Sequence, residues 1–138
     1  MIPRISQAPQ VSELTTEFLN TLRQNGFTGD ISSTYADRLT MATDNSIYQL
    51  LPQAVIFPRS TADVTIVARL VDEPRFHSLS LTPRGGGTGT NGQALTEGIV
   101  VDLSRYMKRI IEINPEQRWV KVEAGVIKDE LNLFLKPY

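Results

Sequence analysis

A dense run of glycines is the feature of this sequence with the clearest chemical potential. Five of its nine glycines lie between Gly85 and Gly92, in the run Gly-Gly-Gly-Thr-Gly-Thr-Asn-Gly. Because glycine has no Cβ, the backbone of such a loop can come close to a ligand, and consecutive N–H groups can converge on an anion. The run therefore predicts a loop that holds a phosphate group. The alternative is a surface loop in which glycine only makes tight turns.

Two familiar phosphate-binding motifs do not fit the surroundings of this run. Residues 87–92 spell G-x-G-x-x-G, but a dinucleotide fingerprint needs a crossover helix directly after the glycines. The apolar run Ile99–Leu103 follows too soon to leave room for a helix of about a dozen residues. A P-loop needs Lys and then Ser or Thr after its last glycine, where Gln93 and Ala94 stand. The remaining interpretation is a phosphate-holding loop between two strands.

The elements that must position this loop begin with a strand, a helix and a second strand. Ala54–Phe57 is a short apolar run ended by a proline, which is typical of a strand buried on both faces. Ser60 and Asp63 have capping-box spacing and open a helix, which must end before Pro74. A second strand over 79–82 leads into the glycines. This order predicts a right-handed βαβ unit with parallel strands.

The rest of the chain predicts further elements around this unit. Upstream, a helix is expected over 11–25 with Gly26 as its C-terminal cap, and 28–51 reads as mostly loop and short helix. Downstream, the expected elements are a strand over 99–103, a hairpin with strands 109–114 and 118–124, and a helix over 128–135. The predicted fold class is α+β, with a small sheet flanked by helices and continued by an antiparallel hairpin.

Composition and charge exclude several classes of function. The 14 Lys and Arg nearly balance the 15 Asp and Glu, so the net charge of −1 provides no broad attraction to nucleic acid. With no Cys, this chain has no disulfide, thiolate nucleophile or iron–sulfur ligand. Its single His, His77, excludes a site with several His ligands to a metal.

The two ends of the chain support predictions about the cellular location of the protein and about the completeness of the chain. The N-terminus has no apolar segment behind its charge, and no run of about 18 apolar residues could span a bilayer, which predicts a cytoplasmic protein. The C-terminus stops directly after an apolar helical pattern, which favours a truncated chain. We expect such an end to leave Leu131, Leu133 and Leu135 uncovered and to promote self-association.

Four blocks of sequence, in this order, carry a family resemblance over about residues 52–138. They are Pro52-Gln-Ala-Val-Ile-Phe-Pro-Arg-Ser-Thr-Ala-Asp-Val64, Thr82-Pro-Arg-Gly-Gly-Gly-Thr-Gly89, Gly98-Ile-Val-Val-Asp-Leu-Ser104 and Val120-Lys-Val-Glu-Ala-Gly-Val126. They resemble the opening of a PCMH-type (vanillyl-alcohol-oxidase-like) FAD-binding domain. The segment Thr43–Gln49 is similar to the lead-in of FAD-linked D-2-hydroxyacid dehydrogenases. The whole chain resembles the N-terminus of the large bacterial FAD/iron–sulfur dehydrogenases of the D-2-hydroxyglutarate or D-lactate type.

The resemblance implies a set of cofactor-binding residues. The backbone of the glycine loop would hold the FAD pyrophosphate, and Pro58 would shape the neighbouring loop or simply end its strand. Arg84 would either pair with the cofactor or brace the loop through backbone carbonyls. Thr88 stands where relatives with covalent flavin often carry His, which implies noncovalent FAD. The implied FAD-binding residues are Pro58, Arg84, Gly85, Gly86, Gly87, Thr88, Gly89, Thr90, Asn91 and Gly92.

The resemblance also implies an activity and a domain organisation. Residues 1–51 would be a helical lead-in and 52–138 the first subdomain of the FAD-binding domain. The intact protein would transfer a hydride from a small 2-hydroxyacid to FAD and pass electrons to an acceptor, and any iron–sulfur cluster would lie in a missing C-terminal region. The fragment alone would be inactive and contain no catalytic residue. The alternatives are a flavoenzyme for another alcohol or sugar and a non-catalytic anion-binding or nucleotide-binding module.

Four other residues have side chains that could act in catalysis or cofactor binding, but each has a simpler structural interpretation. His77 reads as a solvated loop residue, and Asp102 as an acceptor of backbone hydrogen bonds at a strand end. Trp119 reads as an aromatic side chain that packs on the sheet. Glu123 is expected to face solvent in the alternation of the hairpin.

Overall fold

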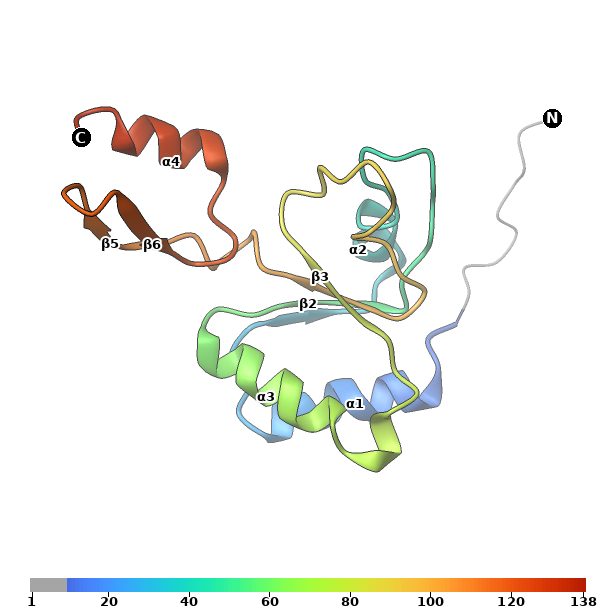
Figure 1. Cartoon of the computed structure of the whole chain (residues 1–138). Coiled ribbons are helices and arrows are strands. Elements are labelled where there is room, and N and C mark those ends of the chain that lie inside the picture. Colours follow the sequence, from blue (N-terminus) through green and yellow to red (C-terminus); the bar gives the residue numbers. More distant parts are fainter. Residues whose placement is uncertain (1–9) are drawn as a thin grey trace.

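The computed structural model describes residues 10–138 (Figure 1). Residues 1–9, in which the sequence predicts no signal segment, lie outside the described residues. The elements in chain order are α1 (Glu13–Gln24), β1 (Asp30–Ser32), α2 (Tyr35–Thr40), β2 (Ala54–Phe57), α3 (Thr61–Val71), a 3-10 helix (Pro74–Phe76), β3 (Leu81–Arg84), β4 (Ile99–Asp102), β5 (Ile110–Asn114), β6 (Trp119–Val122) and α4 (Lys128–Leu135). This mixture of helices and strands confirms the predicted α+β class.

A four-stranded sheet with the order β1-β2-β4-β3 forms the centre of the fold. Strands β2 and β3 both run parallel to β4, which lies between them, whereas β1 pairs with β2 in the antiparallel direction. The predicted parallel arrangement of the strands on either side of α3 is therefore confirmed. A separate two-stranded sheet consists of β5 and β6, the predicted hairpin.

The main core lies between one face of the sheet and the helices α1 and α3, which lie side by side beneath it in Figure 1. Strand β2 is buried on both faces, as its apolar run predicts. Ala54 and Ile56 belong to the core on the helix side, and Val55 and Phe57 belong to a smaller cluster on the other face. On the helix side, the rings of Phe18 in α1 and Phe76 meet edge to face, with centroids 5.1 Å apart. These contacts hold the N-terminal helix against the sheet.

Strands β1 and β3 differ from the sequence-based expectations for reasons that the structure shows. Strand β1 lies in the stretch that was expected to be loop and short helix, because three residues are too few to show a strand period. Strand β3 begins at Leu81 rather than at residue 79. The cause is that the N–H of Leu79 bonds to the carbonyl of Phe76, within the turn that follows the 3-10 helix.

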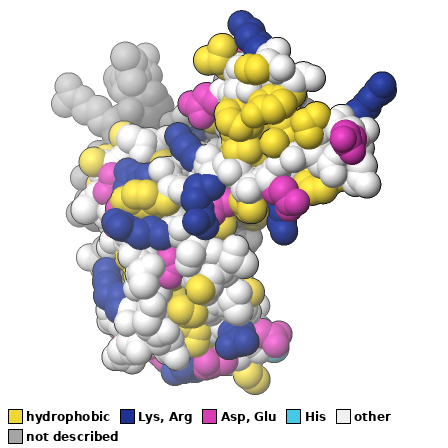
Figure 2. Space-filling view, turned by 90° about the vertical axis from the view of Figure 1, so that its left-hand side faces the viewer, with side chains coloured by type: hydrophobic (Ala, Val, Ile, Leu, Met, Phe, Trp, Pro, Cys, Tyr) yellow, Lys and Arg dark blue, Asp and Glu magenta, His cyan; other side chains and the backbone are white. Residues whose placement is uncertain are grey.

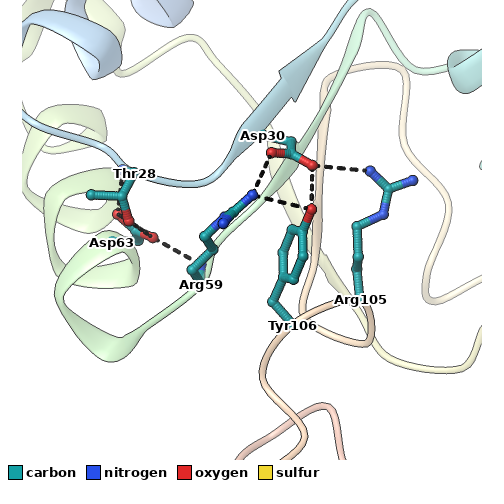
Figure 3. Close-up of polar contacts among 6 residues, drawn as sticks. All are labelled: Thr28, Asp30, Arg59, Asp63, Arg105 and Tyr106. Atoms are coloured by element: carbon teal, nitrogen blue, oxygen red, sulfur yellow. Dashed lines mark hydrogen bonds and ion pairs between the residues drawn. The ribbon is translucent and has the colours of Figure 1, made fainter.

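Asp63 joins the start of α3 to the segment before β1 (Figure 3). Its side chain is 1% exposed, and Oδ1 accepts a hydrogen bond of 2.8 Å from the N–H of Thr28. Oδ2 accepts another bond of 2.8 Å from the N–H of Arg59. The predicted capping contact is also present, since the Ser60 hydroxyl accepts from the N–H of Asp63. One buried carboxylate thus links two other backbone segments, at Thr28 and Arg59, to the start of α3.

Asp30 in β1 ties the sheet to the loop after β4 (Figure 3). It accepts hydrogen bonds from the Tyr106 hydroxyl and from the guanidinium groups of Arg59 and Arg105. The bond from Tyr106 is the largest cause that lowers the pKa of Asp30, and the two arginines lower it further. The same arginines stack on aromatic rings, Arg59 on Tyr106 and Arg105 on Phe57. The loop after β4 is therefore fixed at the sheet surface.

The hairpin and α4 stand apart from the four-stranded sheet in Figure 1. The structure shows no buried residue in α4 within the described chain. Figure 2 looks at this side of the molecule and shows hydrophobic side chains gathered in its upper part. We call the following residues the apolar patch: Ile111, Trp119, Leu133, Phe134 and Tyr138, all more than a third exposed. A groove of about 260 Å³ between the hairpin and the end of α4 adjoins it.

Two further properties concern residues 10–138 as a whole. Within this range, the helices are too short or too polar to cross a bilayer. The same residues contain no group of three or more His, Cys, Asp or Glu side chains placed to hold a metal ion.

Candidate functional site

Three chain segments meet where the parallel strands end. Because β2, β4 and β3 run in the same direction, their carboxyl ends lie on one side of the sheet. Pro58 follows β2, the glycine loop follows β3, and a loop that contains Tyr106 follows β4. In open α/β sheets this side is the usual place for a ligand. The topology therefore places the glycine loop at the expected position for binding.

A cavity of about 350 Å³ lies against the first half of the glycine loop. One wall consists of Gly85, Gly86 and Thr88, and the opposite wall is the segment 124–129, which leads into α4. The first wall was predicted from the glycine run. The second wall was not predicted as a site, although Gly125 directly after a strand marked a change of direction.

The two glycines in the cavity wall are not required by the packing of the described chain. A Cβ on Gly85 would find no described atom within 4 Å, and one on Gly86 would meet only the Thr88 methyl group at 3.6 Å. Neither residue has a positive φ. Glycine at these positions is therefore not needed to relieve strain, and it leaves the loop backbone uncovered by any Cβ where it borders the cavity. This is the arrangement that a closely approaching anion needs.

Gly87 is required for a different reason. Its φ is +65°, and a Cβ there would come within 2.3 Å of Nη2 of Arg84. The guanidinium therefore lies directly against the loop backbone. Nη2 donates a 2.8 Å hydrogen bond to the carbonyl of Thr43, so the bracing contact expected of Arg84 is present. Nη1 is buried and has no hydrogen-bond partner among the described residues.

The second half of the loop lies elsewhere. Asn91 and Gly92 line a separate cavity of about 330 Å³ together with Tyr48, Gln49, Leu50 and Leu95. The N–H of Asn91 bonds to the side chain of Gln93, and a Cβ on Gly92 would lie 3.1 Å from the Tyr48 ring. Pro58 is fully buried at the end of β2 and is not a lining residue of either described cavity. The structure thus brings together only part of the predicted set.

The opposite wall is fixed by a close approach and by an ion pair. A Cβ on Gly125 would fall 2.0 Å from the carbonyl oxygen of Leu103, and the N–H of Gly125 bonds to Met107. The expectation that Glu123 faces solvent is wrong, since this residue is only 7% exposed. Its carboxylate binds the guanidinium of Arg109 at 2.7 and 2.9 Å, and this contact lowers the pKa of Glu123. Glu123 therefore anchors the base of the wall.

The start of α4 also borders this cavity. Lys128 and Asp129 are lining residues and belong to the first turn of the helix. Ile127 is the N-cap residue, and its side chain makes no capping bond within the described structure. The first N–H groups of a helix need partners, and they favour negative charge. Lys128 and the helix end attract an anion here, whereas Asp129 in the cavity lining and Glu130 in the same turn oppose that attraction.

The other residues considered from sequence have structural surroundings. Asp102 accepts hydrogen bonds from the N–H of Arg105 and the hydroxyl of Ser104, which confirms its predicted role at a strand end. His77 is exposed, and its ring contacts the carbonyl of Asp72. Trp119 lies at the groove beside α4, and its indole N–H bonds to Gln117.

Comparison with known proteins identifies the fold. A family described as "FAD binding domain" matches residues 52–138. The chain belongs to this family of FAD-binding domains. The solved structure of an alkyldihydroxyacetonephosphate synthase superposes on 98% of this FAD-binding chain with a TM-score of 0.78, at 17% sequence identity, and the chain covers 27% of that protein. At that identity the likeness supports the fold alone.

Two bacterial relatives match the FAD-binding chain over its full length. It is 70% identical over 138 residues to D-2-hydroxyglutarate dehydrogenase of Escherichia coli K12, and 66% identical to D-2-hydroxyglutarate dehydrogenase of Pantoea ananatis. In both comparisons the chain spans 14% of the length of the relative.

Proposed function

We propose that this chain is the FAD-binding part of a D-2-hydroxyglutarate dehydrogenase. The identity of 70% to the Escherichia coli enzyme over all 138 residues supports this assignment. Because the chain spans 14% of that relative, the groups that bind the substrate are assigned to other parts of the protein. The proposed reaction transfers a hydride from the hydroxyl-bearing carbon of a D-2-hydroxyacid to FAD, and the hydroxyl proton leaves to a base. An electron acceptor then reoxidises the flavin.

The proposal rests on the cavity beside Gly85 and Gly86. This cavity has loop backbone uncovered by any Cβ on one side, which suits a pyrophosphate, and Lys128 on the other, with Asp129 as an opposing charge. The residues proposed to hold the cofactor are those of the loop Arg84–Gly92. The N–H groups from Arg84 to Gly89 would bind the phosphate oxygens, with Thr90, Asn91 and Gly92 behind them. Pro58 would act by shaping the adjacent turn. Thr88 has no nucleophilic ring nitrogen to attach a flavin, which supports noncovalent binding.

The chemistry of hydride acceptance belongs to the flavin itself. What this chain contributes is affinity and placement. The fixed loop and the wall anchored by Glu123 would hold the diphosphate end of the cofactor and leave the reactive ring to be placed against the substrate. An iron–sulfur cluster, if the intact protein has one, is assigned to a region outside these residues.

We further propose a cytoplasmic location and a lead-in over residues 1–51 that precedes the domain proper at 52–138. The apolar patch supports self-association of this chain, because exposed apolar surface of this kind favours contact with another copy.

The decisive experiment compares FAD binding by the full-length protein and its Gly86→Val variant. The free protein has room for the first side-chain atom, since only the Thr88 methyl group lies within 4 Å in the described chain. A bound pyrophosphate would compete for the same space, so we expect FAD affinity to fall at least tenfold while the fold is kept. Gly26→Ala is the control. The φ of +82° at Gly26 makes this substitution costly for stability, and Gly26 does not line the cavity.

Flavin fluorescence and elution of flavin after gel filtration give the two readouts. Unchanged affinity in Gly86→Val would contradict the proposed cradle and favour a loop that only turns. Bleaching of the visible flavin absorbance on addition of D-2-hydroxyglutarate tests whether this hydroxyacid is the substrate. Bleaching only by another alcohol or by a sugar would assign the protein to a different flavoenzyme, and the absence of FAD binding would favour a non-catalytic module.

A further inference from the structure

One short turn contacts both walls of the cavity beside the glycine loop. It comprises residues 103–107, directly after β4, and we call it the spacer turn. At its start, the N–H of Leu103 donates a 2.9 Å hydrogen bond to the carbonyl of Arg84, where the glycine loop begins. At its end, the carbonyl of Met107 accepts a 2.9 Å bond from the N–H of Gly125, which lines the opposite wall. The position of the spacer turn therefore determines how far apart the two walls lie.

The spacer turn is closed by its own hydrogen bonds. The N–H of Met107 bonds to the carbonyl of Leu103 at 3.2 Å, and the carboxylate of Asp102 accepts a 3.0 Å bond from the N–H of Arg105. Asp102 is 3% exposed, so the start of the turn is buried at the end of β4. The carbonyl oxygen of Leu103 also lies where a Cβ on Gly125 would have to be. Because the turn is compact and touches the wall directly, a shift of its tip would move the wall.

Tyr106 attaches the tip of the spacer turn to strand β1 (Figure 3). Its hydroxyl donates a hydrogen bond to Oδ2 of Asp30, and its ring centroid lies 4.5 Å from the guanidinium of Arg59. Asp30 is held in the sheet, where it pairs with Phe57 of β2. Arg105 also forms an ion pair with Asp30, but at 3.4 Å and between side chains that are 46% and 41% exposed, so that water screens it. The hydroxyl of Tyr106 is therefore the main anchor of the tip.

We propose that Tyr106 is a positioning residue for the cofactor: its bond to Asp30 holds the spacer turn in place and so sets the separation of the two walls around the diphosphate of FAD. This inference rests on the proposed function. A diphosphate that contacts both walls binds most tightly when their separation is already correct, because binding then requires less ordering of the protein. Asp30 lies before residue 52, where the family match begins, so strand β1 becomes a support of the cofactor site.

The test measures the dissociation constants of FAD and ADP for the full-length protein and its Tyr106→Phe variant. Phenylalanine keeps the ring beside Arg59 and removes only the hydroxyl. Because both ligands carry the diphosphate, we expect both constants to rise by the same factor, about fivefold. Tyr35→Phe in α2 is the matched control, since Tyr35 does not line the cavity, and it should leave both constants unchanged. The temperature is one at which circular dichroism shows every variant to be folded, so that a lower stability alone does not change the constants.

Two variants of Asp30 show whether the hydroxyl bond is responsible for the effect. Asp30→Ala removes the acceptor and should lower the affinity as Tyr106→Phe does, and the double variant should bind no more weakly than Asp30→Ala alone. Asp30→Asn keeps an oxygen that can accept from Tyr106, so we expect a smaller loss than in Asp30→Ala. Equal losses in the two Asp30 variants, additive losses in the double variant, or unchanged affinity in Tyr106→Phe would each overturn the inference. If the unmodified protein bound neither FAD nor ADP, the proposed function would fail first, and the inference with it.

Discussion

The buried carboxylate of Glu123 is bound by both the side chain and the backbone of Arg109. The guanidinium donates two hydrogen bonds to Oε1, and the N–H of the same residue donates one of 2.8 Å to Oε2. The two residues flank the hairpin, Arg109 just before β5 and Glu123 just after β6. Because the wall of the cavity begins at the next residue, Ala124, this pair connects the geometry of the hairpin to the site.

Replacing Glu123 by Gln should lower the thermal midpoint by about 4 °C, and the difference from the unmodified protein should depend on pH. Arg109 lowers the pKa of Glu123. The stabilisation is therefore complete above the ordinary glutamate pKa of about 4.3, and it is lost as the pH falls through the lowered value. Thermal unfolding followed by circular dichroism from neutral to acidic pH measures this. A difference that stayed constant into acid would contradict it, and Glu116→Gln in the hairpin turn serves as the control.

Two neighbouring glycines should respond differently to the same substitution. Gly87→Ala should lower the free energy of unfolding by about 1–2 kcal/mol, because its φ is positive and its Cβ would meet Arg84. Gly86→Ala should change it by less than about 0.5 kcal/mol, because only the Thr88 methyl group lies within 4 Å in the described structure. Urea unfolding of both variants provides the comparison. Equal losses would show that the loop does not hold this conformation in solution.

Asp63→Ala should be among the more destabilising single substitutions. It removes the acceptor for the N–H groups of Thr28 and Arg59 in a site that is 1% exposed. Leaving such donors without partners should cost about 3 kcal/mol, measured by urea unfolding. The control is Asp72→Ala at the other end of α3, which should cost less than about 0.5 kcal/mol. A small effect at Asp63 would mean that water replaces the carboxylate.

Self-association of the 138-residue chain should depend on the apolar patch. Leu133→Glu places a charge at a residue that is 64% exposed in the last turn of α4, and it should shift the chain toward monomer. Light scattering after gel filtration at several concentrations measures the change. Ile47→Glu, at an exposed position outside the patch, should leave the mass unchanged. A monomeric unmodified chain at all concentrations would argue against the proposal.

The sequence was sufficient to predict elements whose pattern is local. The apolar run at Ala54–Phe57 identified β2, and the glycines marked the loop that borders the cavity. Glu123 was placed wrongly because the alternation of β6 ends at Val122, so the residue after it turns inward to Arg109. The second wall at 124–129 depends on the contact of Gly125 with Leu103, which no local pattern encodes.

The pairing of β1 with β2 has a consequence for how the protein stays in solution. Residues 30–32 cover the open side of β2, whose four residues are all buried. A chain trimmed to the matched region 52–138 would leave that apolar strand with unpaired N–H and C=O groups, and such strands recruit strands from other molecules. The short β1 therefore protects the protein against aggregation by strand addition, and it lies outside the part of the chain by which the family is recognised.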